Sequence, residues 1–286
     1  MARNGIDRLV REALPLVPFL AFVVIFLLIP TVTVVVSSVY DQGVFSLDRI
    51  HALFTDTALT ALWKSVLLSG STALIGAVLG AVLAALIVSS PPTSLFRRMV
   101  ISLCSVLAQF GGVALAFAFL ATIGLNGVLT VWAQDHFGWN LTGSGWLYSL
   151  TGLILVYTYF QIPLMVIVFL PALEGLREQW REAAVGLGAT TWQYWRQVAI
   201  PLLTPAFLGS ALLLFANAFA AYATAAALVS QGSPILPLLI RAALTSEVVL
   251  GQAGFAYALA LEMIVVVAVV MVAYTALVRR TARWLQ

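Results

Sequence analysis

The sequence predicts an all-α membrane protein with six transmembrane helices and both termini in the cytoplasm. Three observations lead to this prediction: the composition, six long apolar stretches, and an uneven placement of basic residues. Hydrophobic residues make up 62% of the 286 residues and charged residues only 9%, against roughly 25% charged in an average soluble domain. Because soluble monomers rarely expose large apolar patches, this composition requires the bilayer as a second solvent.

Six stretches are long enough to cross a hydrocarbon core about 30 Å thick, which takes about 20 apolar residues. They cover about residues 14–39, 62–88, 99–123, 147–173, 202–229 and 255–278. The first is too long for the apolar region of a cleavable signal peptide, and no A-x-A-like site follows it, so we expect a retained helix. The chain therefore divides into a cytoplasmic segment 1–13, a transmembrane domain 14–278 and a cytoplasmic tail 279–286.

The basic residues fix the orientation. Of the 14 lysines and arginines, all but Arg49, Lys64 and Arg241 fall on one side of the predicted membrane. That side carries Arg3, Arg8, Arg11, Arg97, Arg98, Arg177, Arg181, Arg196, Arg279, Arg280 and Arg283. Loops rich in Lys and Arg stay in the cytoplasm, so this is the cytoplasmic side. Since the basic residues are spread over segment ends, we expect no nucleic-acid surface.

Small residues recur every four positions along the second predicted helix, at Thr72, Gly76, Gly80 and Ala84. Such spacing lets two helix backbones approach closely. The stripe could serve a partner chain or the chain's own bundle, and packing within one bundle is the interpretation we favour.

The predicted cytoplasmic loop 174–201 has the pattern of a helix, a turn and a second helix. Glu174 with Arg177, and Glu178 with Arg181, are opposite charges at i,i+3, which supports a solvated helix. Gly186 and Gly188 are expected to end this helix.

A second helix is expected after the turn. Thr190 and Gln193 fit the capping box that begins a helix, and Pro201 is expected to end the motif where the fifth membrane helix begins. A short helix lying across the membrane face between two turns is a shape that docks into a groove on another protein.

Within this loop, seven residues follow a known pattern of Glu-Ala-Ala, three residues, Gly, nine residues, and Ile-x-Leu-Pro. They are Glu182, Ala183, Ala184, Gly188, Val198, Ile200 and Pro201. The pattern resembles the EAA loop of binding-protein-dependent ABC importer permeases, with Val198 and Ile200 standing where the family has Ile and Leu. The alternative is an amphipathic connector with no partner.

The resemblance extends over most of the chain and implies the type I, MetI-like permease fold. Residues 110–119, 159–165 and 214–224 resemble the branch that includes spermidine/putrescine permeases. A small polar or cationic solute such as a polyamine is therefore the expected substrate. Ferric iron, phosphonate, sulfate and sugar remain alternatives, since relatives of this kind transport them.

The resemblance implies that this chain forms half of a membrane pathway in the bacterial cytoplasmic membrane. A second permease, expected to be a different chain, would supply the other half. Two ATPase subunits would dock from the cytoplasm and hold ATP and magnesium, and an extracytoplasmic binding protein would deliver substrate. The sequence itself contains no G-x-x-x-x-G-K-[ST] phosphate loop, because its one lysine, Lys64, has no such glycines before it. We therefore expect a transport subunit, with no cofactor of its own and no enzymatic activity.

Four polar residues within predicted spans are candidates for the substrate pathway: Glu262, Asn217, Tyr222 and Gln161. Ionisable residues in membrane helices are rare and often functional, so Glu262 could attract a cation from the pathway. It could equally be protonated or reach out of the membrane. The amide and phenol side chains could instead form hydrogen bonds between helices.

Two further expectations concern the outside of the membrane and metals. The segment 231–250 is too short to span and could close the pathway, contact the binding protein or only cover the bundle. His51, His136 and Cys104 are isolated from one another in the sequence, so no metal site is predicted.

Two other classes of protein remain open. An ATP-independent secondary transporter or channel is one, although such proteins often show inverted repeats and paired broken helices, which are not evident here. A membrane scaffold that recruits a cytosolic partner through the loop is the other.

Overall fold

The computed structural model describes residues 16–41, 44–45, 48–91, 93–143, 145–229, 235–245 and 252–282. The predicted cytoplasmic segment 1–13, residues 283–286 of the tail, and residues 231–234 and 246–250 of the outer segment lie outside these ranges. The chain divides into two compact units, residues 1–59 with 239–265 and residues 60–238 with 266–286.

The first unit begins with an apolar helix in three parts. These are α2 (Val17–Val23), the π-helical turn η2 (Val24–Leu28) and α3 (Ile29–Val39). The hydroxyls of Thr31 and Thr33 donate to the carbonyls of Leu27 and Ile29 at 2.7 and 2.9 Å, so both hydroxyls are satisfied within the helix. Two antiparallel strands of two residues each follow, β1 (Tyr40–Asp41) and β2 (Val44–Phe45). After them come α4 (Asp48–His51) and the 3₁₀ turn η3 (Ala52–Phe54).

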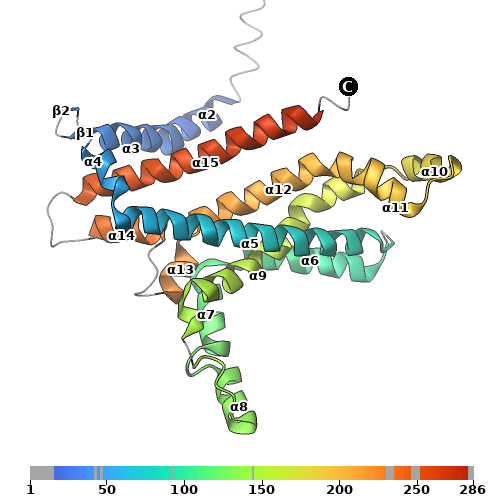
Figure 1. Cartoon of the computed structure of the whole chain (residues 1–286), viewed down its shortest axis with the longest axis horizontal. Helices are drawn as coiled ribbons and strands as arrows, with labels where there is room; N and C mark the ends of the chain where they lie inside the picture. Colours follow the sequence, from blue (N-terminus) through green and yellow to red (C-terminus); the bar gives the residue numbers. More distant parts are fainter. Residues whose placement is uncertain are drawn as a thin grey trace, which may run out of the picture. The chain divides into compact units, whose positions relative to one another are not determined.

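The second unit holds most of the helices (Figure 1). They are α5 (Asp56–Val88), which starts just before the unit's boundary, α6 (Leu95–Gln109), α7 (Gly112–Ile123), α8 (Val128–Phe137), η4 (Trp146–Tyr148), α9 (Leu150–Glu174), α10 (Glu178–Gly186), α11 (Thr191–Tyr194), the π-helical turn η5 (Trp195–Ala199), α12 (Ile200–Ala220) and α13 (Ala223–Leu228). Two more helices, α14 (Leu236–Thr245) and α15 (Gln252–Ala282), run across the boundary between the units.

Six helices within the described residues are long and apolar enough to cross a membrane, as the sequence predicts. They cover Val17–Val39, Asp56–Val88, Gly112–Phe137, Leu150–Glu174, Thr191–Ala220 and Gly254–Ala276. The all-α, six-span fold class is confirmed, although the bounds of the third and fifth predicted helices are wrong.

The third predicted helix, 99–123, is not continuous. It breaks after Gln109, and α7 starts only at Gly112, whose φ is +68°. Glycine adopts this left-handed backbone without the steric penalty of a side chain, so the Gly111-Gly112 pair allows the chain to turn sharply between α6 and α7 (Figure 1). Hydropathy alone cannot detect such a break inside an apolar run.

The fifth predicted helix, 202–229, is also wrong at both ends. It begins earlier, because α11, η5 and α12 join into one helix from Thr191, so Pro201 lies inside it near the start of α12. It ends earlier too, because Ala221 has extended backbone before α13 begins. The carbonyl of Ala221 accepts a 2.6 Å hydrogen bond from the Tyr157 hydroxyl of α9, which satisfies a polar group released at the break.

The stripe of small residues on α5 packs against α9. Thr72, Gly76, Gly80 and Ala84 are all buried. A Cβ atom placed at Gly76 would lie 2.6 Å from Cβ of Gln161, and one at Gly80 would lie 2.5 Å from Cβ of Met165. The two backbones therefore approach so closely that only glycine fits, and packing within the chain's own bundle accounts for this part of the stripe.

Candidate functional site

The first half of the loop 174–201 ends in a Schellman turn. Gly188 has a φ of +81°, its N–H donates to the carbonyl of Val185 at 2.9 Å, and the N–H of Ala189 donates to that of Ala184 at 3.0 Å. This pair of bonds is the usual way to satisfy the last carbonyls of a helix. Gly186 is the last residue of α10 and does not itself form the turn.

The second half begins with the predicted capping box. The backbone N–H of Thr190 donates to Oε1 of Gln193 at 2.7 Å, and the N–H of Gln193 donates to Oγ1 of Thr190 at 3.3 Å. Both bonds fix where α11 starts. The helix–turn–helix geometry expected from the sequence is therefore present, with α10 and α11 at the ends of α9 and α12 (Figure 1).

The seven residues of the EAA pattern lie on the accessible part of this loop and the helix that follows. Six of them are exposed and Ala184 is half-buried: Glu182, Ala183, Ala184, Gly188, Val198, Ile200 and Pro201. They are free to meet a partner, but nothing in the fold by itself assigns them a role.

Two apolar side chains of the loop were missed by the sequence reasoning. Leu187 is 90% exposed and Val185 is 58% exposed, and both lie outside the six candidate spans. Leu187 occupies the Schellman turn directly before Gly188, so the turn holds it away from the bundle. A leucine beside the glycine of the pattern is the signal that would have predicted it.

The base of the loop is held by a side chain from another helix. Glu174, the last residue of α9, forms an ion pair with Arg97 in the first turn of α6. The sequence instead predicts a pair between Glu174 and Arg177, whose guanidinium carbon lies 5.9 Å from the centre of the Trp180 ring. Arg97 was missed as a partner because it is 77 residues distant in the chain.

Of the four predicted pathway residues, Gln161 is entirely buried in the bundle. Its Nε2 donates to the carbonyl of Leu214 on α12 at 2.8 Å, while its Oε1 is buried without a partner among the described residues. Gly76 of α5 meets the same side chain. This geometry fits a hydrogen bond joining α9 to α12, one of the two interpretations left open by the sequence.

The other three candidates differ from Gln161 in their exposure. Asn217 is exposed on α12, and Tyr222 is half-buried at the break between α12 and α13. Glu262 is half-buried on α15 in the first unit, and its Oε2 is buried with no hydrogen-bond partner in the part of the chain that the structure describes. The role of these residues in a substrate pathway stays a prediction.

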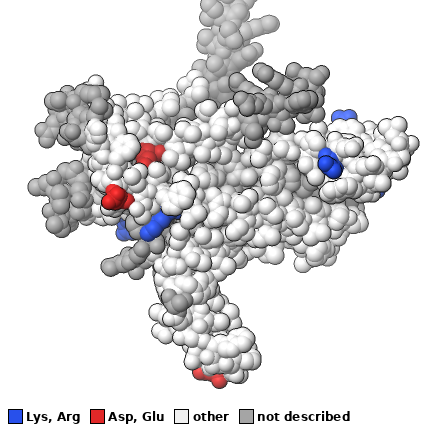
Figure 2. Space-filling model, in the orientation of Figure 1, with Lys and Arg blue, Asp and Glu red and all other residues white. Residues whose placement is uncertain are grey.

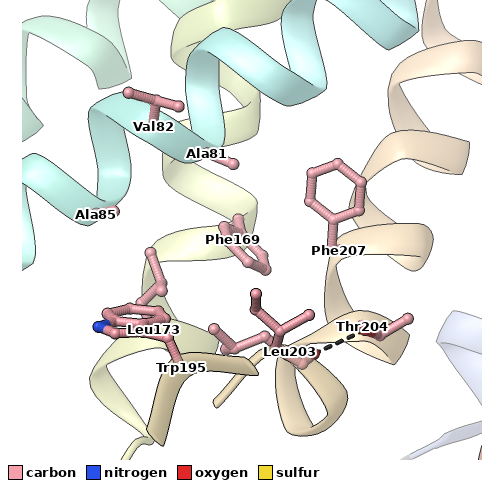
Figure 3. Close-up of a pocket in the computed structure, with 10 residues that line it drawn as sticks. Ala81, Val82, Ala85, Phe169, Leu173, Trp195, Leu203, Thr204 and Phe207 are labelled. Carbon is pink, nitrogen blue, oxygen red and sulfur yellow. Dashed lines mark hydrogen bonds between the residues drawn. The ribbon is translucent and has the colours of Figure 1, made fainter. Parts of the chain in front are cut away.

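An apolar groove of about 420 Å³ lies between α5, α9 and the start of α12. Phe169 and Phe207 face each other across it, edge to face, with ring centres 5.8 Å apart (Figure 3). Its other walls include Ala81, Leu173 and Trp195. With no charged residue in its lining, the groove has no group that would hold an ion.

Charged side chains are sparse on the face drawn in Figure 2, as the composition predicts. Within the described residues, no three His, Cys, Asp or Glu side chains gather closely enough to hold a metal ion.

Comparison with known proteins now identifies the chain's family. Residues 113–283 match the family described as the inner membrane component of binding-protein-dependent transport systems. The chain belongs to this family. The match covers more than half of the chain and contains the whole loop 174–201, so the family resemblance read from the EAA pattern is confirmed.

The individual relatives are distant. The chain is 24% identical over 196 residues to the putative ferric transport system permease protein FbpB 1 of Haemophilus influenzae, covering 68% of this chain and 30% of the relative. It is 28% identical over 176 residues to the thiamine transport system permease protein ThiP of the same species, covering 60% and 31%. With the sulfate transport system permease protein CysW of Escherichia coli it shares 27% identity over 192 residues, covering 67% and 62%. The chain thus spans less than two thirds of each of these relatives.

Two solved structures share the fold. A bacterial ABC transporter involved in the import of the acidic polysaccharide alginate matches with a TM-score of 0.75 at 18% identity, covering 98% of both chains. The MetNI methionine ABC transporter, in inward-facing conformations, matches with a TM-score of 0.59 at 16% identity, covering 79% of this chain and 96% of that one.

Together these findings describe a multi-pass bacterial inner membrane protein of an importer permease family, with the predicted MetI-like fold. They do not support the narrower prediction of a polyamine substrate, because the relatives named above carry the names of ferric, thiamine and sulfate systems. The family also leaves the ATP-independent carrier and the scaffold without support.

Proposed function

We propose that this chain is the transmembrane permease subunit of an ATP-driven importer and forms one half of its substrate pathway. In this proposal the loop 174–201 faces the cytoplasm and docks into a cleft of an ATPase subunit. The loop then converts movement of the ATPases into movement of α9 and α12, to which it is joined.

The observation that carries the proposal is the apolar surface of the loop. Leu187, exposed at 90%, and Val185 stand outside the six candidate spans. Large apolar side chains that stand outside both the membrane spans and the bundle become buried when a partner covers them, which lowers the free energy of the complex. The Schellman turn and the capping box hold these residues in place, so the loop is pre-organised for docking.

The residues proposed to carry the junction are those of the EAA pattern. Ala183 and Ala184 permit close approach of a partner, Gly188 permits the turn, and Glu182 is an exposed charge on α10 that a basic residue of the ATPase could bind.

The other subunits follow from the same proposal. Two ATPase subunits would bind ATP and magnesium, a second and different permease would complete the pathway, and an extracytoplasmic binding protein would deliver the solute. One of the similar structures contains an alginate transporter in complex with an alginate-bound periplasmic protein, which supports a binding protein as a partner.

For the substrate we propose only a class, a small polar or ionic solute of the kinds named for the relatives. Ferric iron, sulfate and thiamine are better supported than a polyamine by those names. We propose that Asn217, exposed on α12, and Tyr222, at the helix break, line this pathway.

Co-purification from membranes tests the proposal. Tagged wild-type chain is expected to retain an ATPase subunit, and the double variant Glu182→Lys/Gly188→Val to lose it. Gly138→Val is the matched control, because Gly138 has a φ of +68° and, as at Gly188, a Cβ atom added there would meet nothing within 4 Å. Retention of ATPase by the control but not by the double variant supports docking through the loop.

The opposite outcomes are equally clear. If wild-type chain retains no ATPase and moves solute alone in liposomes, the importer proposal is wrong. If the ATPase is retained, binding of ferric iron, sulfate, thiamine and putrescine to the associated binding protein identifies the substrate.

A further inference from the structure

One arginine joins the ends of three helices at the base of the loop. Arg97, in the first turn of α6, is only 8% exposed. Its Nη1 donates to the carbonyl of Ser90, just beyond the end of α5, at 3.1 Å. Its Nη2 pairs with Oε1 of Glu174, the last residue of α9. A single guanidinium therefore connects the α5–α6 hairpin to the start of the loop 174–201.

The geometry of this contact suits arginine better than lysine. A guanidinium presents several N–H groups in a rigid plane, so it can serve a carbonyl and a carboxylate at the same time. A lysine at this position would offer one compact charge on a flexible chain. The next residue, Arg98, is exposed, and it provides a matched control with the same side chain on the same turn.

Apolar packing supports the ion pair from the membrane side. Ile87 of α5, Cys104 of α6 and Leu173 of α9 are buried in one cluster. The end of α9 therefore packs against both helices of the hairpin, in a close-packed interior that transmits strain. Glu174 remains 45% exposed, so the carboxylate is the accessible side of the contact.

We propose that Arg97 is a positioning residue that makes the α5–α6 hairpin and the loop 174–201 move as one body. The inference rests on the proposed function, because it concerns how movement of the docked loop spreads into the membrane. Through the chain itself the loop moves only α9 and α12. The seam at Gly76 and Gly80 joins α5 to α9 inside the bundle, and Arg97 adds a direct connection from the base of the loop to the ends of α5 and α6.

Distance measurement between two spin labels tests this inference. Cys104, the only cysteine, is replaced by alanine, and labels are attached to cysteines at Thr93, between α5 and α6, and at Gln179 on α10, both exposed. The complex with its retained ATPase is measured without nucleotide and after trapping with Mg-ATP and vanadate. The expected wild-type result is the same distance distribution in both states.

Four variants separate positioning from simple structural support. Arg97→Ala is expected to make the distance change with nucleotide, and Arg98→Ala to behave as wild type. The double variant Arg97→Glu/Glu174→Arg restores the charge pair but not the hydrogen bond to the carbonyl of Ser90. Its distance is therefore expected to change with nucleotide much less than that of Arg97→Ala. Glu174→Gln keeps the size of the side chain, and it serves in place of Arg97→Ala if that variant does not fold.

The inference is overturned if wild type itself shows a nucleotide-dependent distance, or if Arg97→Ala and Glu174→Gln match wild type in both states. If Arg97→Ala and Glu174→Gln only lower the yield of the complex and keep the same distance in both nucleotide states, the inference is also overturned. A pair with a purely structural role would behave in this way. Failure of the proposed function is seen separately, since wild-type chain would then retain no ATPase, and the inference would fall with it.

Discussion

The α5–α9 seam and the loop 174–201 both depend on glycine, but for opposite reasons. At Gly76 and Gly80 a Cβ atom would lie 2.6 and 2.5 Å from side-chain carbons of α9, so glycine is needed for space. At Gly188 a Cβ atom would meet nothing within 4 Å, and glycine is needed for its φ of +81°. The seam therefore holds the bundle together, whereas the turn at Gly188 sets the shape of an exposed loop. Substitutions should affect the two regions differently.

The largest effect on stability is expected in the seam. Gly80→Ala forces a methyl group against Met165 and the carbonyl of Ile162, and overpacking of this kind costs roughly 2 to 3 kcal/mol. Thermal unfolding of the purified chain in detergent, followed by tryptophan fluorescence, measures the loss. Gly70→Ala on the same helix is the control, because its Cβ would meet nothing within 4 Å. Equal unfolding temperatures for the two variants would show that the seam is looser than described.

A smaller loss is expected at the turn. Gly188→Ala places a side chain in left-handed backbone, which costs roughly 1 to 2 kcal/mol, and the loop relieves part of this strain because it is exposed. Unfolding should therefore shift less than for Gly80→Ala, while ATPase retention falls. Gly186→Ala, two residues earlier and in helical backbone, should leave both measurements unchanged. A greater unfolding shift at Gly188 than at Gly80 would contradict the distinction between space and conformation.

A still smaller change is expected for the polar contact beside the seam. Gln161→Leu removes the bond to the carbonyl of Leu214 but also the unpartnered Oε1. Hydrogen bonds between membrane helices contribute about 0.6 kcal/mol on average, so the free energy of unfolding should change by no more than this. Asn217→Leu, at an exposed position of α12, removes an amide side chain outside this contact and is measured for comparison. If Gln161→Leu abolished solute uptake without changing stability, Gln161 would belong to the pathway after all.

The smallest effect on stability, with a large effect on assembly, is expected at Leu187. Leu187→Ser changes a side chain that is 90% exposed, so no packing is lost and unfolding should match wild type. Retention of the ATPase should nevertheless drop, because the exposed apolar contact is removed. Leu125→Ser is the control, since Leu125 is also exposed but lies between α7 and α8. Full ATPase retention by Leu187→Ser would remove the observation that carries the proposed function.

Predictions from local pattern were accurate wherever the deciding contacts lie close in sequence. The capping box of Thr190 and Gln193 joins residues three apart, and the αL turn at Gly188 depends on one residue's backbone, so both could be predicted. The Glu174–Arg177 pair had the same local logic but was wrong, because Glu174 pairs with Arg97 from a distant segment. Local charge pairs on a helix stabilise it by only a few tenths of a kcal/mol, so a better distant partner prevails.

The breaks after Gln109 and Ala220 show a second limit. Apolar composition measures only whether a stretch can lie in the bilayer, and it is the same for one helix as for two with a turn between them. The turn at Ala221 is supported by the hydroxyl of Tyr157 from another helix. A partner of that kind, 64 residues away, has no signature in the residues near the break.

By itself, the sequence determined that the chain lies in a lipid bilayer, how many helices span it, and that the loop forms a helix, a turn and a second helix. Each of these follows from composition or from residues within a few positions of one another. Only the tertiary structure decided that Gly76 and Gly80 meet α9, that Gln161 is buried against Leu214, and that Arg97 joins α5, α6 and α9. The physical reason is that these contacts depend on which helices are neighbours. In an apolar chain nearly every helix face is hydrophobic enough to pack against any other, so the pattern alone does not select the partner.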